Sequence, residues 1–250
     1  MLVVFGDSLS FCGPEGALEF TDTRTYPFVT SATLSELTGE RWETQLECHA
    51  GWSIRDLAVQ MRRPDYQSLI READAAVVAV GSIDTFTVGL PGGLGLSHRK
   101  RPRLQHLELR WLRDWFQPRY LELHAGLITL TRERIPHTSR RQFRGSWSTV
   151  IGNLRDNRTP AFAFLPVKNR SPLFANSNRF HQARCSELLE MLERQGHGCV
   201  TAFDATTIVD ANAAHISPDG LHWDFTLHQI VGQRLASAIV DRRLGLRAVV

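Results

Sequence analysis

Five short stretches with strand patterns limit most strongly what this chain can fold into. They occupy residues 1–5, 42–48, 75–80, 161–165 and 199–203, and helical patterns separate them. Ala75–Val80 is continuously apolar, which is typical of a parallel strand buried on both faces. Strands that alternate with helices predict a parallel sheet covered by helices on both sides. The predicted fold class is therefore α/β, with five parallel strands in a three-layer sandwich.

The helical patterns are assigned from apolar spacing and from residues that begin or end helices. We expect helices at about residues 26–38, 104–116, 119–134, 146–157, 178–195 and 205–214. A further helix begins after Gly51, and Thr226 is expected to cap the last one. The chain is predicted to form one domain over residues 1–250, with a basic, Trp-rich helical insertion at about residues 85–145.

Composition excludes several classes of protein. A chain of 250 residues fits one large α/β domain, and its hydrophobic content of 42% is ordinary for a globular protein. The first residues lack the basic start of a signal peptide, and no stretch approaches the roughly twenty apolar residues of a membrane span. We therefore expect a cytoplasmic protein. Its four cysteines lack the spacing of a zinc site, so no metal site is predicted.

The net charge of +3 hides an uneven distribution of basic residues. Between His98 and Arg144 the chain carries twelve of them: Arg99, Lys100, Arg101, Arg103, Arg110, Arg113, Arg119, Arg132, Arg134, Arg140, Arg141 and Arg144. Such a segment is typical of a solvated face, or of a surface that meets an anionic ligand or a membrane. Both interpretations remain open at this point.

The first candidate for chemistry is Ser8, on the turn Gly6–Ser8 at the end of the first strand. Open α/β sheets bind ligands at the carboxyl ends of their strands. A serine on a sharp turn, beside backbone N–H groups, suits a nucleophile whose developing oxyanion must be stabilised. Taken by itself, the same tripeptide is also an ordinary Asp-Ser turn.

The second candidate group is Asp219 and His222, which stand close together before the last helix. A triad mechanism requires a histidine that takes the serine proton and a carboxylate that orients the histidine. On a short loop that contains Pro218 and Gly220, both side chains can point the same way. Gly51 ends the second strand, where a glycine allows close backbone approach and the next helix begins.

Together these residues resemble the four sequence blocks of the SGNH (GDSL) hydrolase superfamily. The matching segments are Gly6–Ser10, Gly51, Gly81–Asp84 and Asp219–His222, in the family's order. The resemblance implies a flavodoxin-like fold with strand order 2-1-3-4-5. It implies Ser8 as nucleophile, His222 as general base and acid, and Asp219 as orienting carboxylate. The backbone N–H groups of Ser8 and Gly51 would donate to the oxyanion.

One position departs from that family pattern. The third block usually holds an Asn that donates to the oxyanion, and this chain has Ile83 there. Removing one oxyanion donor typically costs about 10²–10³ in rate when nothing replaces it. Ser82 is the candidate replacement, with a backbone N–H of the same loop as the alternative.

A narrower resemblance concerns the substrate. The segments Asp7–Gly16, Arg110–Arg119 and Asp219–Trp223 are similar to the actinobacterial diglucosylglycerate octanoyltransferases, which also lack the usual Asn. The resemblance implies an octanoyl group moved from acyl-CoA, as donor substrate, to a glucosylglycerate-type acceptor in methylglucose lipopolysaccharide synthesis, with no cofactor. Candidate substrate-binding residues are Asp7, Trp52, Asp84, Arg110, Arg113 and Arg119.

Several alternatives remain open at this level. Transfer and hydrolysis share the acyl-Ser8 intermediate, so a carboxylesterase or thioesterase for short acyl esters is the second hypothesis. A module that binds nucleic acid or other anions through residues 98–144 is a remote third, because no nucleic-acid motif is present. Asp7 and Asp84 are alternatively expected to support their loops or to cap local N–H groups. His49 is placed beside the pocket, and His228 is expected to be a surface histidine.

Overall fold

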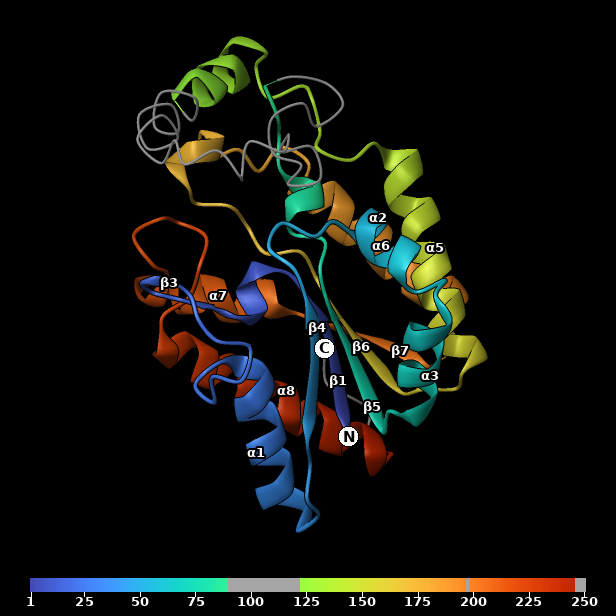
Figure 1. Cartoon of the computed structure of the whole chain (residues 1–250). Helices are drawn as coiled ribbons and strands as arrows, with labels where there is room; N and C mark the ends of the chain where they lie inside the picture. Colours follow the sequence, from blue (N-terminus) through green and yellow to red (C-terminus); the bar gives the residue numbers. More distant parts are fainter. Residues whose placement is uncertain (90–121, 197, 246–250) are drawn as a thin grey trace, which may run out of the picture.

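The computed structural model describes residues 1–89, 122–196 and 198–245. Five parallel strands form its main sheet: β1 (Leu2–Gly6), β4 (Thr44–Cys48), β5 (Ala75–Ala79), β6 (Ala161–Phe164) and β7 (Val200–Phe203). They lie in the order β4-β1-β5-β6-β7 (Figure 1). Counted along the chain, this is the order 2-1-3-4-5. The predicted fold class is confirmed.

The position of β1 explains why its sequence is so apolar. It lies between β4 and β5, where Val4 is opposite Leu46 on one side and Val77 on the other. All five of its residues are buried. β4 is an edge strand and is only partly buried, which accounts for its alternation of polar and apolar residues.

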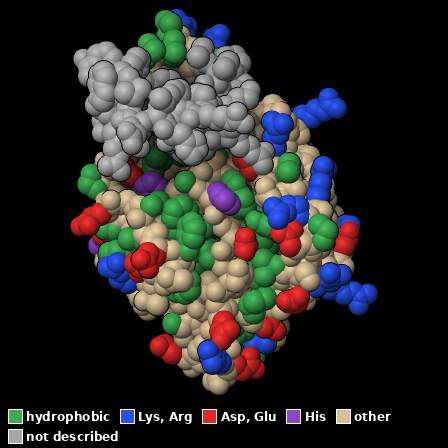
Figure 2. Space-filling view, in the orientation of Figure 1, with side chains coloured by type: hydrophobic (Ala, Val, Ile, Leu, Met, Phe, Trp, Pro, Cys, Tyr) green, Lys and Arg blue, Asp and Glu red, His purple; other side chains and the backbone are tan. Residues whose placement is uncertain are grey.

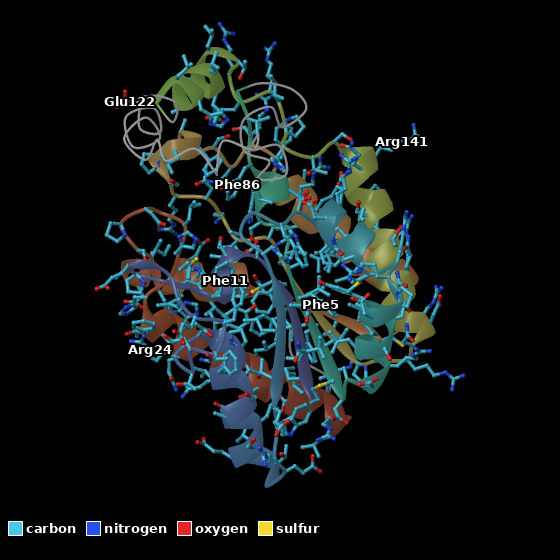
Figure 3. The ribbon with its side chains drawn as sticks, viewed as in Figure 1. Phe5, Phe11, Arg24, Phe86, Glu122 and Arg141 are labelled. Atoms are coloured by element: carbon cyan, nitrogen blue, oxygen red, sulfur yellow. The ribbon has the colours of Figure 1, made fainter. Side chains whose placement is uncertain are left out.

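Helices cover both faces of the sheet because successive side chains of a strand point to opposite faces. Val3 and Phe5 pack with the layer of helices that comprises α2 (Ile54–Gln60), α3 (Pro64–Glu72), α5 (Arg140–Asp156) and α6 (His181–Gln195). Leu2 and Val4 pack with α1 (Tyr26–Thr38), α7 (Ala205–Ala211) and α8 (Phe225–Arg243). Figure 3 labels Phe5 beside the strands, on the side of the sheet that the first of these two layers covers.

Several expected helix boundaries were wrong for local reasons. α5 begins at Arg140 instead of Ser146, because Ser139 and Gln142 form a capping box. The last helix is capped by Asp224, whose side chain accepts from Leu227 N, and not by Thr226. After Gly51 there are two helices, and the second of them begins at Pro64.

The chain leaves the sheet after β5 and returns before α5. A 3-10 turn, η2 (Ile83–Thr85), follows β5, and Val88 N then donates to Ile135 O at 2.8 Å while His137 N donates to Phe86 O at 2.9 Å. The outgoing and returning segments therefore lie side by side. Residues 122–130 are helical, within the helix expected at 119–134. The helix expected at 104–116 lies outside the described residues.

Candidate active site

Ser8 lies where the sequence predicts it, on the turn that follows β1. It opens a 3-10 turn, η1 (Ser8–Ser10), which Asp7 caps by accepting a hydrogen bond from Leu9 N at 3.0 Å. Ser10 Oγ is 2.9 Å from Tyr26 Oη, so the far end of the turn is fixed as well. A Cβ at Gly6 would lie 1.9 Å from Ser10 Oγ, which is why this turn requires glycine.

The structure brings Asp219 and His222 together in one loop. Asp219 Oδ1 accepts from Leu221 N at 2.9 Å and from His222 N at 3.0 Å, and Oδ2 lies 2.5 Å from His222 Nδ1. Partial burial acts to raise the pKa of Asp219, but these hydrogen bonds outweigh it and hold the pKa below its ordinary value. Asp219 therefore stays an acceptor near neutral pH.

The ionised Asp219 determines which nitrogen of His222 carries the proton. A carboxylate only accepts hydrogen bonds, so Nδ1 is the protonated nitrogen of the neutral ring. Nε2 is then left with a free electron pair. This atom is buried and has no hydrogen-bond partner among the described residues, Ser8 included. The arrangement is that of an oriented imidazole able to accept a proton at Nε2.

The two loops lie near one another at the carboxyl end of the sheet. Cys12, four residues beyond Ser8, has a pKa raised to about 11, first by burial and then by the charges of Asp7 and Asp219. The Asp219 charge thus acts on the segment that carries Ser8. Gly51 and Gly81 follow β4 and β5, the two neighbours of β1, so the first three sequence blocks meet at the carboxyl end of the sheet.

Gly51 adopts a φ of +71°, in the left-handed region that favours glycine. It is exposed at the start of the segment that leads into α2. Trp52 is one of the candidate substrate-binding residues. Its side chain is buried in the core on the α2 side, and its ring centroid is 4.5 Å from that of His49. The buried Trp52 side chain thus anchors the Gly51 loop in the core.

In the third block, Ser82 was the candidate replacement for the oxyanion-binding Asn, but its hydroxyl oxygen is used elsewhere. Ser82 Oγ accepts a hydrogen bond from Val167 N at 3.0 Å, so this hydroxyl oxygen faces the segment that follows β6. Ile83 packs against an apolar cluster of Phe86, Ile128 and Phe174. The position that holds an oxyanion-binding Asn in the SGNH pattern is therefore apolar in its surroundings too.

Asp7 and Asp84 are both buried, and their carboxylates bind groups of the protein itself. Asp84 Oδ2 accepts from Ile54 N at 2.8 Å, and Oδ1 accepts from the Thr138 hydroxyl. Burial raises the pKa of each carboxyl to about 7, and the nearby Asp84 charge contributes to the shift at Asp7. This geometry is that of loop supports, which is the alternative that the sequence left open for both residues.

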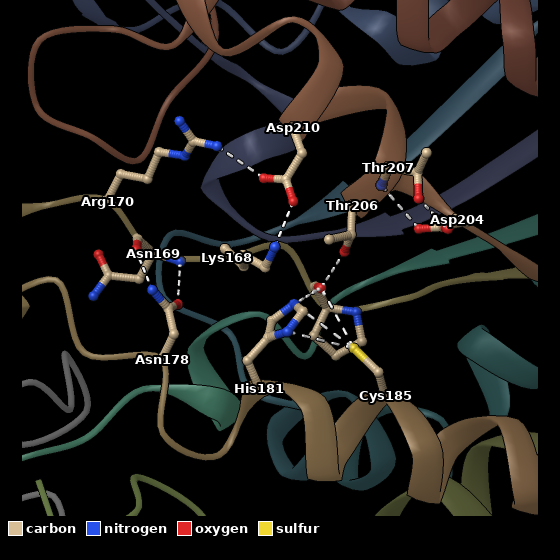
Figure 4. A network of polar contacts seen from close by, with 11 residues as sticks. Lys168, Asn169, Arg170, Asn178, His181, Cys185, Asp204, Thr206, Thr207 and Asp210 are labelled. Carbon is tan, nitrogen blue, oxygen red and sulfur yellow. Dashed lines mark hydrogen bonds and ion pairs between the residues drawn. The ribbon is translucent and has the colours of Figure 1, made fainter.

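A structured segment after β6 carries the Asp219 loop. Figure 4 shows Asn169 and Asn178 joined by reciprocal hydrogen bonds, in which Asn169 N donates at 2.8 Å and Asn178 Nδ2 at 2.7 Å. Lys168 and Arg170 both bind Asp210 of α7. Arg170 N in turn donates to Gly220 O at 3.0 Å. The polar loop expected at residues 169–178 thus holds the Asp219 loop in position.

The predicted anion-binding residues Arg110, Arg113 and Arg119 lie outside the described residues. Two arginines from the described part of the basic segment bind carboxylates of α6: Arg140 binds Glu187 at 2.7 Å and Arg144 binds Glu190 at 3.2 Å. In Figure 2, Lys and Arg side chains stand on the right, where α5 lies in Figure 1, with acidic residues among them. This part of the segment is a mixed, solvated face.

Known proteins similar to this chain include curated relatives and solved structures. No protein-family model matches the chain. Two curated proteins named diglucosylglycerate octanoyltransferase are similar to it over almost its whole length. The one from Mycobacterium tuberculosis is 24% identical over 245 residues, 96% of this chain and 92% of the relative. The one from Mycolicibacterium hassiacum is 26% identical over 244 residues, 96% and 95% of the two chains.

Solved structures share the fold. An α/β hydrolase from the metagenome of Lake Arreo, Spain, superposes with a TM-score of 0.59 at 16% identity, over 96% of this chain and 94% of that one. A variant of an acetyl xylan esterase from Geobacillus stearothermophilus gives 0.58 at 12% identity, over 95% and 93%. This chain is an enzyme that resembles these octanoyltransferases in sequence and these hydrolases and esterases in fold. Both resemblances stated from its sequence blocks are confirmed.

Three features of the enzyme's site were missed by reasoning from sequence. Thr138, on the returning segment, holds Asp84, and Gly220, which was expected only to shape its own loop, also permits the close approach of that loop to Arg170. His228 is fully buried, so the expectation of a surface histidine was wrong. The apolar spacing of the last helix includes Leu227 and Val231, which flank position 228 on one helix face, and this signal could have placed His228 on the buried face.

The described part of the enzyme holds no group of three or more His, Cys, Asp or Glu side chains placed to bind a metal ion. Within the same residues, no helix combines the length and the apolar character that crossing a bilayer requires.

Proposed function

We propose that the enzyme transfers a medium-chain acyl group, octanoyl, from acyl-CoA to a glucosylglycerate-type sugar acceptor through an acyl-Ser8 intermediate. The observation that carries the proposal is the Asp219–His222 pair beside the Ser8 turn, in a chain similar over its length to two proteins named diglucosylglycerate octanoyltransferase. The acyl donor, the acceptor and the roles of the three residues all belong to this proposal.

In the first half-reaction Ser8 Oγ attacks the thioester carbonyl while His222 Nε2 takes the serine proton. Asp219 holds His222 in the required tautomer and stabilises the imidazolium that forms. The backbone N–H groups of Ser8 and Gly51 would donate to the tetrahedral oxyanion. The carbon–sulfur bond then breaks, and coenzyme A leaves as a thiol with the proton from His222.

In the second half-reaction His222 removes a proton from an acceptor hydroxyl, which attacks acyl-Ser8. The new ester leaves, and the proton returns to Ser8 Oγ. If water attacks instead, the product is free octanoate. Hydrolysis is therefore the second candidate function, and the structural similarity to esterases favours considering it.

The test follows coenzyme A release and product mass for octanoyl-CoA with and without glucosylglycerate or diglucosylglycerate. We expect an octanoylated sugar, and release of coenzyme A that is faster with acceptor. Equal rates of free octanoate formation in both tubes would assign the enzyme to hydrolysis.

Ser8→Ala is expected to abolish turnover in either reaction, because the proposed acyl-enzyme forms on Ser8 Oγ. Ser237→Ala, which removes an exposed hydroxyl from α8, is the matched control and should retain full activity. Unchanged turnover in Ser8→Ala would contradict the proposed nucleophile.

A further inference from the structure

Three buried aromatic residues outside the catalytic group connect the Ser8 turn to the His222 loop. Tyr26 begins α1, Trp223 directly follows His222, and His228 lies in the first turns of α8. Their ring centroids are 5.6–6.2 Å apart, and each residue is at most 1% exposed. We call these three residues the aromatic bridge.

Both ring nitrogens of His228 are used within the protein. Nδ1 accepts from Tyr26 N at 3.2 Å, and Nε2 lies 3.0 Å from Cys12 O. An amide N–H only donates and a carbonyl only accepts, so the proton of the neutral ring is on Nε2. Burial lowers the pKa of His228 to about 4, which keeps the ring neutral and both hydrogen bonds intact near pH 7.

On one side, the aromatic bridge holds both ends of the segment that follows Ser8. Tyr26 Oη contacts Ser10 Oγ at 2.9 Å, and His228 donates to Cys12 O. Ser10 and Cys12 lie two and four residues after Ser8. A shift of α8 relative to this segment would therefore move the serine turn.

On the other side, the aromatic bridge holds the loop that carries His222. The Trp223 ring packs on both Tyr26 and His228, and its backbone forms an isolated β-bridge with Ile216 across the loop. His222 O accepts from Ser217 N at 2.7 Å inside that loop. The position of His222 Nε2, which has no hydrogen-bond partner among the described residues, is thus set by this packing and by Asp219.

We propose that His228 is a positioning residue for acyl transfer: its two ring hydrogen bonds, within the aromatic bridge, set the separation between Ser8 Oγ and His222 Nε2. The inference rests on the proposed roles of Ser8 and His222. A displacement of about 1 Å between reacting groups costs on the order of 10²-fold in rate. Such a loss falls on kcat, because the bridge is buried and does not touch substrate.

Three substitutions separate the two hydrogen bonds. In His228→Gln the amide nitrogen replaces Nε2 as donor to Cys12 O, whereas in His228→Asn the amide oxygen replaces Nδ1 as acceptor for Tyr26 N. His228→Phe keeps an aromatic ring at this position but can form neither of the two hydrogen bonds. We expect kcat with octanoyl-CoA to fall about tenfold in the Gln variant and on the order of 10²-fold in the Asn and Phe variants, with KM within twofold of wild type.

A second readout does not depend on the acyl donor or acceptor. The rate of covalent labelling of Ser8 by a fluorophosphonate reports only how well Ser8 is activated, and it should fall in the same order. Tyr26→Phe, which removes the contact with Ser10 and keeps the aromatic packing, should also label more slowly. It keeps the inference testable if a His228 variant fails to fold.

Thr159→Val is the stability-matched control. It removes the buried hydrogen bond from Thr159 Oγ1 to Ile70 O, which lies at the amino-terminal end of β6, away from the site. Its melting temperature should fall while its kcat and labelling rate stay at the wild-type values.

The outcomes separate the two proposals. Wild-type kcat and labelling rate in His228→Phe would overturn the positioning role alone, and so would an equal loss of kcat in Thr159→Val. Normal Ser8 labelling without octanoyl transfer would overturn the proposed substrates and leave the positioning role supported or rejected by the labelling series. Failure of the fluorophosphonate to label wild-type Ser8 would overturn the proposed nucleophile and this inference together.

Discussion

Gly220 shows how a single residue without a side chain determines the site. It separates Asp219 from Leu221 and His222, and its φ of +73° belongs to the left-handed region. A Cβ there would lie 2.3 Å from Arg170 O and 2.6 Å from Ser171 N. The Asp219 loop can approach the segment after β6 this closely only because position 220 is glycine.

Gly220→Ala is therefore expected to unfold more easily, by about 1–3 kcal/mol or more, and to lose most of its activity, since backbone strain and a backbone clash add. Gly39→Ala is the matched control. Its φ is +70° at the end of α1, with nothing within 4 Å of the added Cβ, so it carries the strain without the clash. Urea unfolding and turnover of both variants check this, and full activity in Gly220→Ala would contradict it.

At the scale of elements, the contact between α1 and α8 determines how the aromatic bridge is held. The two helices approach closely at Gly232, where a Cβ would lie 2.7 Å from Val29 Cβ and 3.0 Å from Tyr26 O. Thr30 Oγ1 also reaches Gly232 O at 3.3 Å. Tyr26 belongs to α1 and His228 to α8. The distance between the two helices therefore affects both the Ser8 turn and the His222 loop.

Gly232→Ala is expected to lower the free energy of unfolding by about 1–3 kcal/mol, because it overpacks this contact. Gly145→Ala, at an exposed position in α5 with open space around the added Cβ, is expected to raise it by up to about 1 kcal/mol. Thermal unfolding distinguishes them. An increase in melting temperature for both variants would contradict this prediction, because it would show that the α1–α8 contact accommodates the added methyl group.

At the scale of the whole molecule, buried ionisable groups couple stability to pH. In the folded state Asp84 has a pKa of about 7, against 3.8 for the free carboxyl. Between about pH 4 and 7 the unfolded chain has lost this proton and the folded chain retains it, so stability falls as pH rises. His228 acts oppositely: its lowered pKa, about 4 against 6.5, makes stability fall as pH drops through that range.

Comparison with Asp84→Asn isolates the carboxyl. The amide can still accept from Ile54 N, and the Thr138 hydroxyl can accept from the amide. Relative to wild type, the variant is expected to gain unfolding free energy as pH rises from 5 to 7, by at most about 1.4 kcal/mol per pH unit. Urea unfolding at several pH values measures this difference. Parallel curves for the two proteins would contradict the raised pKa.

The amino-acid sequence by itself determined the α/β fold class and the four blocks of the site, whereas the strand order came only from the resemblance to a known family. Strand and helix patterns depend on neighbouring residues, and a turn such as Gly6–Ser8 has its geometry fixed by the residues within it. The Asp219–His222 pair is local too, since three positions separate the two side chains. These features could be predicted because the interactions that form them are short in sequence.

Only the tertiary structure decided which distant side chains meet. Asp84 binds Thr138 across 54 positions, and Tyr26 binds His228 across 202. Ser82 faces Val167 because β5 and β6 are neighbours, and no pattern near Ser82 contains that information. His228 is buried because α8 packs on α1 at that turn. A residue's role as support or surface depends on what covers it, and that is settled when the layers assemble.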